Sequence, residues 1–230
     1  ITANEFRMTQ QRYDAGSAKM KELGITDKHL YKDHIEVRGV KHSLDEAIGV
    51  YVYAQQKAAL DKLLSPDGNR YTQADIVTIV SSLSDEHKAW GDFLIQEMTS
   101  RHAALSEVFR KVSNKKLSQV AKYFPLVRSG KDATMTDMLE EEYFNRQENP
   151  QDGMLKERTG GQYSLALNAT TIWNRMVRKQ EHYISAAEWV NDTQYLLRKN
   201  GGDLYDSIAL AKGSKYAEAL QDFVDRFANN

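Results

Sequence analysis

The sequence predicts an all-α fold: an irregular multi-helix bundle with two long helices and an extended crossover that contains a proline. Apolar residues recur at helical spacing along almost the whole chain, and only short stretches alternate as a strand would. Prolines number only 3 in 230 residues, so few positions interrupt a helix. We expect residues 1–230 to form one helical domain, with 1–122 and 123–230 as an alternative subdivision.

The amino-acid composition of the chain excludes several kinds of site and disfavours others. Hydrophobic residues make up 41% and charged residues 27% of the chain, which is typical of a folded globular protein. Lys and Arg number 31 and Asp and Glu 32, so no net field attracts polyanions. The absence of cysteine excludes disulfides, thiolate metal sites and a cysteine nucleophile. No apolar run approaches the roughly 20 residues that a membrane span needs.

The first forty residues predict two helical segments. Apolar residues at helical spacing indicate a helix over Ala3–Leu23, and Gly24 follows where a left-handed helix end belongs. The stretch Asp27–Lys41 is polar and contains Gly39. We therefore expect it to be a short helix followed by a loop.

The strongest helix start is the sequence SLDE. Ser43 and Glu46 have the spacing of a capping box, in which each side chain accepts a hydrogen bond from the other residue's backbone N–H. The helix that follows is predicted to end at the turn sequence SPDGN, residues 65–69. Its core face comprises Leu44, Ala47, Ile48, Tyr51, Val52, Ala58, Ala59 and Leu63.

Two further caps precede amphipathic helices. Thr72 is expected to cap a short helix, and Ser84 a long one that is interrupted at Ser113 and Asn114. The apolar stripe of the long helix comprises Trp90, Phe93, Leu94, Met98, Leu105, Val108, Phe109 and Val112.

The second half of the chain predicts three helices and a further segment that is either a helix or an ordered excursion, residues 134–149, and Ser214 is expected to cap the last helix. The longest helix, 165–199, is expected to end at Asn200, Gly201 and Gly202. The three helices span 165–199, 204–211 and 216–227.

The stretch YFPLVR is predicted to be the crossover between the helical halves. Pro125 cannot donate a helical hydrogen bond and favours an extended Phe124, so the chain leaves its helix here. We expect Tyr123 and Phe124 to stay on apolar surface, with the RTGG stretch opposite. The candidate interaction residues are Tyr123, Phe124, Pro125, Arg128, Arg158, Gly160 and Gly161.

A basic stretch just before the crossover supports an alternative function, binding of nucleic acid. It interleaves cations with aromatic residues, as single-strand binding surfaces do. The acidic run Glu140–Glu142 lies downstream and could neutralise it. The candidate contacts are Arg110, Lys111, Lys115, Lys116 and Lys122.

No motif predicts an active site, a metal site or a cofactor. His34 with Glu36 lacks a third ligand at a recognisable spacing. His182 beside Glu181 is better explained as a hydrogen-bonded residue at the core edge than as a general base. We expect a protein that is not an enzyme and has no catalytic residues, although a histidine–carboxylate site stays open as a third hypothesis.

The order of several stretches resembles a helical region of the very large polyvalent proteins of bacteriophages and related mobile elements. The stretches are SLDEAIGVYVYAQ, LSDEHKAWGDFL, KYFPLVR, MLKERTGG and EHY, within residues 40–200. The resemblance implies a helical scaffold or linker in a virion-associated or co-injected protein, located in the virion or the host cytoplasm after delivery. Its partners would be other domains or subunits of that protein, or a host protein. The start at Ile1 fits a piece of a larger protein.

Overall fold

The structure is a computed structural model that describes residues 2–115, 122–129 and 163–228. These residues are mostly helical, which confirms the main feature of the predicted fold class, and they include one small two-stranded sheet. The segment 134–149, predicted as a helix or an ordered excursion, lies outside the described residues. The elements are α1 (Thr2–Glu22), α2 (Asp27–Lys32), β1 (His34–Val37), β2 (Val40–Ser43), α3 (Leu44–Ala54), α4 (Lys57–Leu64), α5 (Gln73–Ser82), α6 (Asp85–Ser113), α9 (Ala169–Arg198), the 3-10 turn η1 (Lys199–Gly201), α10 (Asp203–Lys212) and α11 (Ser214–Ala228).

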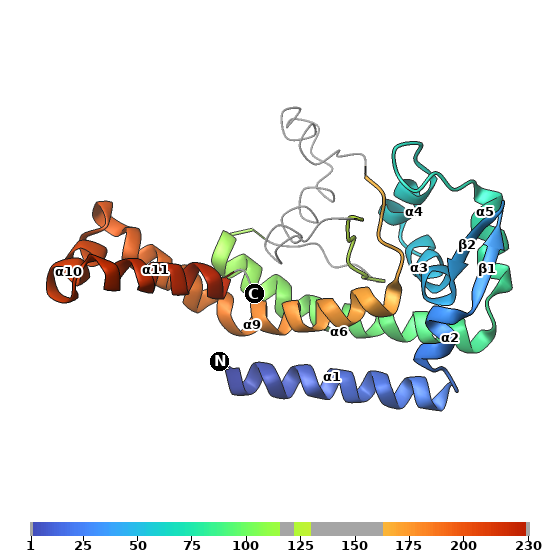
Figure 1. The fold of residues 1–230 in the computed structure, drawn as a ribbon, viewed down its shortest axis with the longest axis horizontal. Coiled ribbons are helices and arrows are strands. Elements are labelled where there is room, and N and C mark those ends of the chain that lie inside the picture. Colours follow the sequence, from blue (N-terminus) through green and yellow to red (C-terminus); the bar gives the residue numbers. More distant parts are fainter. Residues whose placement is uncertain (1, 116–121, 130–162, 229–230) are drawn as a thin grey trace.

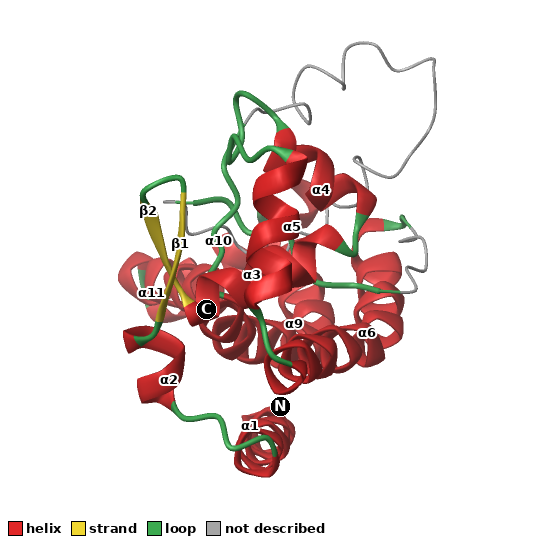
Figure 2. Cartoon of the chain, turned by 90° about the vertical axis from the view of Figure 1, so that its right-hand side faces the viewer, coloured by secondary structure: helices red, strands yellow, loops and turns green. Residues whose placement is uncertain are grey.

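Two long helices, α6 and α9, lie side by side through the centre of the molecule (Figure 1). Figure 2 shows this pair between α1 on one side and α3 and α4 on the other. At the far end, α10 and α11 pack with the last turns of α9. We call residues 189–228 the C-terminal arm.

Two apolar clusters hold the helices together. The larger one joins α3, α5, α6 and α9, and its fully enclosed side chains include Trp90, Tyr53 and Phe109. A smaller cluster holds the arm and is built from Ala186, Val190, Leu197 and Val224. None of the described helices has both the length and the apolar composition to cross a bilayer.

The predicted helix starts are confirmed for α3, α5 and α6. Ser43 and Glu46 form the reciprocal capping box, with distances of 2.8 Å and 3.2 Å between the bonded atoms. Thr72 and Ser84 cap their helices in the same way. Asn114 adopts a left-handed conformation with a φ of 57°, which ends α6 where the sequence predicts. Ser214 is the first residue of α11, not its cap.

The loop predicted before Ser43 is wrong, because this stretch is a β-hairpin. β1 and β2 pair antiparallel, with Val37 opposite Val40. The two residues between the strands, Arg38 and Gly39, have φ values of 52° and 77°. Positive φ at both central positions gives the turn geometry that suits a two-residue hairpin.

The single helix predicted for residues 44–64 is also wrong. The chain breaks at Gln55 and Gln56, and α4 starts in a new direction. Tyr53 is fully buried, whereas Tyr51 and Ala58, both predicted for the core face, are partly buried and exposed, respectively. The break allows Ala59 and Leu63 to reach the core from a second helix.

Helix α9 begins four residues later than predicted because Leu165 is held in extended geometry. Its backbone N–H donates to Asn69 Oδ1 over 2.8 Å, and its carbonyl accepts from Asn69 Nδ2 over 3.0 Å. Leu165 also forms a bridge with Arg128. These backbone groups are therefore satisfied outside a helix.

Asp45 caps α9 from another helix. Asn168 stands at the cap position without a side-chain hydrogen bond, and the backbone N–H of Thr170 donates to Asp45 Oδ1 over 2.8 Å. Asp45 is fully buried, and within the part of the chain that the structure describes its Oδ2 has no hydrogen-bond partner. Burial raises the pKa of Asp45, and the hydrogen bonds from Thr170 partly offset that rise.

The variant Asp45→Asn should therefore change how stability depends on pH. A carboxyl whose pKa is higher in the folded state stabilises the fold below its unfolded pKa of about 3.9 and loses that contribution as pH rises through its folded pKa. We expect the stability of the variant relative to the wild type to increase with pH above about 4, measured by urea unfolding. The exposed Asp61→Asn is the control; a flat difference for Asp45→Asn would contradict the prediction.

Candidate functional site

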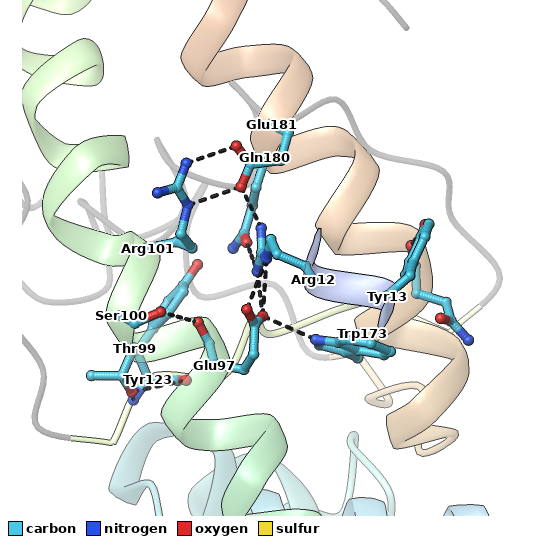
Figure 3. Close-up of polar contacts among 11 residues, drawn as sticks. Arg12, Tyr13, Glu97, Thr99, Ser100, Arg101, Tyr123, Trp173, Gln180 and Glu181 are labelled. Carbon is cyan, nitrogen blue, oxygen red and sulfur yellow. Dashed lines mark hydrogen bonds and ion pairs between the residues drawn. The ribbon is translucent and has the colours of Figure 1, made fainter. Parts of the chain in front are cut away.

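A buried charge network joins α1, α6 and α9, and Arg12 lies at its centre (Figure 3). The Arg12 side chain is 5% exposed. Its Nη2 donates to Glu97 Oε2 over 2.6 Å and to Gln180 Oε1 over 2.9 Å, and its Nη1 donates to Glu181 Oε1 over 2.8 Å. One guanidinium from α1 thus binds carboxylates on both central helices.

Further donors complete the network. Arg101 binds the Glu181 carboxylate with two hydrogen bonds of 2.8 Å and 2.7 Å, and the indole N–H of Trp173 donates to Glu97 Oε2 over 3.1 Å (Figure 3). Each carboxylate is therefore neutralised and oriented by neighbouring donors. This arrangement favours holding the three helices in register over acid–base chemistry.

A surface groove lies on another face of α6. Its volume is about 580 Å³, within the range of ligand sites. We call it the α6 groove. It is lined by Tyr51, Gln55, Asp92, Ile95, Gln96, Thr99, Ser100 and Lys122.

A chain of hydrogen bonds organises one wall of the α6 groove. Lys122 Nζ donates to Gln55 Oε1 over 2.7 Å, and Gln55 Nε2 donates to Asp92 Oδ1 over 3.2 Å. The Tyr51 hydroxyl donates to the same oxygen over 2.9 Å. Burial and the Asp92 carboxylate raise the pKa of Tyr51 to about 12, so this hydroxyl remains a donor at neutral pH.

Gly91 permits this arrangement. A Cβ atom at this position would lie 2.8 Å from the Tyr51 ring, which is closer than such atoms approach. Because Gly91 has no side chain, the Tyr51 ring can lie against α6. The Tyr51 hydroxyl then reaches the carboxylate of Asp92, the residue after Gly91. The groove therefore depends on one glycine at a close contact between two helices.

The predicted crossover begins beside this groove, which Lys122 and Thr99 help to line. Tyr123, Phe124 and Pro125 are buried in a non-helical stretch. The backbone N–H of Tyr123 donates to Thr99 Oγ1 over 2.9 Å, and Figure 3 shows this pair on the left of the charge network.

The other end of the crossover pairs with the stretch before α9. The Arg128 guanidinium lies 4.2 Å from the centre of the Tyr163 ring, and Arg128 bridges Leu165. The residues predicted to lie opposite, Arg158, Gly160 and Gly161, are outside the described residues.

The described residues of the basic stretch have different surroundings. Lys111 lies 3.0 Å from a Glu188 oxygen and 3.8 Å from a Glu107 oxygen, and Lys122 joins the α6 groove. Arg110 is exposed and Lys115 is partly buried. Lys116 lies outside the described residues. A carboxylate partner at Lys111 reduces the positive potential that nucleic acid would need.

Two candidate histidines, His182 and His34, contact carboxylate or carbonyl oxygens within the fold. His182 Nδ1 lies 3.1 Å from Glu5 Oε1, and its Nε2 lies 2.7 Å from the Phe227 carbonyl oxygen, so it links α1 and α11 to α9. His34 Nδ1 lies 2.7 Å from the Lys32 carbonyl oxygen. Across the described ranges, no three His, Cys, Asp or Glu side chains gather as metal ligands would.

Sequence reasoning missed the residues on which both features depend. It named Glu181 only as a neighbour of His182, and it did not single out Arg12, Glu97 or Asp92. The sequence contains only a weak indication of the charge network. Glu5, Arg12 and Gly16 share one helical face of α1, but that face is polar and does not stand out as a buried face would.

Comparison with known proteins adds no assignment. No protein-family model matches the chain, no curated protein matches it and no solved structure matches the fold. The predicted relationship to phage polyvalent proteins therefore stays a prediction.

Proposed function

We propose that this protein is a non-enzymatic helical scaffold that assembles with a second copy of itself through the C-terminal arm. The observation that carries the proposal is the gathering of exposed aromatic and aliphatic side chains on the arm. Soluble proteins expose extended apolar surface mainly at interaction sites. The exposed side chains are Trp189, Tyr195, Leu196, Leu204, Leu210, Tyr216 and Phe223.

Two of these exposed residues, Tyr216 and Phe223, lie in a row on α11 with Leu220 and Phe227, which are partly buried against the arm's own apolar cluster. Tyr216, Leu220, Phe223 and Phe227 recur on α11 with alternating steps of four and three residues, which is the spacing of a coiled-coil seam. The rings of Phe223 and Phe227 stack with centroids 6.0 Å apart, and Trp189 meets Phe227 edge-on at 5.5 Å. We call these four α11 residues the aromatic seam.

The seam is suited to a second copy. When two α11 helices pair antiparallel about a two-fold axis, Tyr216 of each faces Phe227 of the other, and Leu220 faces Phe223. Large side chains then meet at every layer. Five basic and six acidic residues nearly balance along 189–228, so two arms do not repel strongly.

Sedimentation velocity over about 1 to 100 µM protein tests this proposal. We expect reversible dimerisation of the wild type, and we expect Phe223→Glu to weaken it at least about tenfold by placing a charge in the seam. Leu210→Glu is the matched control because Leu210 is 92% exposed on α10, outside the seam. A wild type that stays monomeric throughout, or equal effects of both variants, would refute the proposal.

The resemblance within residues 40–200 would place such a scaffold in a virion-associated or co-injected phage protein. The whole aromatic seam lies beyond the resembling residues, so self-association does not depend on that relationship.

A further inference from the structure

We propose that the α6 groove binds an extended peptide segment of a partner protein through its main chain, one basic side chain and one acidic side chain. The inference rests on the proposal that this protein is an interaction domain. It does not depend on self-association, because the residues that line the groove come from the end of α3, residues 92–100 of α6 and Lys122, whereas the arm is residues 189–228.

The spacing of the groove's polar residues suits a peptide main chain. Asp92, Gln96 and Ser100 follow one another at four-residue steps along α6, which places them about 6 Å apart. An extended chain repeats its orientation every two residues, or about 6.6 Å. The exposed amide of Gln96 offers both a donor and an acceptor, the two groups that a peptide unit requires. The row therefore matches about four extended residues.

The charges of the groove specify the side chains of the ligand. Among the described residues, both hydrogen bonds to Asp92 end on Oδ1, so Oδ2 can accept from a basic side chain. Lys122 donates one hydrogen bond to Gln55, and an ammonium group has two further N–H donors for an acidic side chain. Gln55 lies between the two charges and keeps them apart. Ile95 adds an apolar contact to the groove.

Selection from a displayed library of random 12-residue peptides on the full chain tests this inference. We expect an enriched sequence that contains a basic residue and an acidic residue close together. The synthetic consensus peptide, measured by fluorescence anisotropy, should bind more weakly as salt increases. Its Kd should rise about tenfold in both Asp92→Asn and Gln96→Ala.

The controls separate this inference from the proposed dimer. Asp85→Asn changes an exposed carboxylate on the same helix outside the groove and should leave the peptide Kd unchanged. Gln96→Ala should leave sedimentation unchanged, whereas Phe223→Glu should leave peptide binding unchanged. The inference would be overturned if the library yields no consensus, if the consensus lacks a basic residue, or if its binding is insensitive to both groove variants.

Discussion

Replacing Arg12 with methionine is expected to lower the free energy of unfolding by about 3 to 5 kcal/mol, measured by urea denaturation. Arg12 is buried between Glu97 and Glu181, and it is the only residue of α1 that binds either carboxylate among the described contacts. Methionine preserves length and helix propensity but leaves Glu97 with the Trp173 indole as its remaining partner in the network. An incompletely paired buried charge is costly.

Arg7→Met is the matched control on the same helix. Arg7 is exposed and bonds to Asn4, so its replacement should change stability by no more than about 0.5 kcal/mol. A double-mutant cycle of Arg12→Met with Glu97→Gln should return a coupling of about 0.5 to 3 kcal/mol. If Arg12→Met costs no more than Arg7→Met, the network does not stabilise the docking of α1.

The predicted starts of α3, α5 and α6 were accurate because their caps are local. Ser43 with Glu46, and Thr72 with Asp75, satisfy backbone N–H groups within three residues. Nothing distant is needed to form these hydrogen bonds, so their spacing in the sequence is sufficient evidence.

The predictions from sequence were wrong where residues that are distant in the sequence determine the local structure. Asn69 holds Leu165 in extended geometry across 96 residues of sequence, and this contact delays the start of α9. The face of α1 that is buried carries Arg12 and Gly16, and Gly16 accommodates the Trp173 ring, to which an added Cβ would come within 2.3 Å. This face of α1 packs through the ion pairs of Arg12 and through the space that Gly16 leaves for the Trp173 ring. Neither feature adds an apolar side chain to α1, so a search for apolar periodicity cannot find the face.

The sequence did not predict the α6 groove, for a similar reason. Tyr51 and Tyr53 are two residues apart on α3, and the periodicity assigned Tyr51 to the core, whereas the structure encloses Tyr53. Tyr53 packs edge-on against Phe124 and donates to the Pro125 carbonyl over 3.1 Å. Tyr51 is directed to Asp92 because Gly91 admits its ring. Which tyrosine faces the core is therefore decided by α6 and the crossover, not by α3.

Replacing Phe124 with alanine is expected to destabilise the protein by about 3 to 5 kcal/mol and to lower Tm by roughly 10 °C. Phe124 is fully buried, and its ring centroid lies 5.7 Å from that of Tyr53, so alanine leaves a cavity beside an aromatic ring. Phe6→Ala is the matched control, because Phe6 is 71% exposed on α1 and its truncation should cost no more than about 0.5 kcal/mol. Equal Tm values for the two variants would show that the crossover is not part of the core.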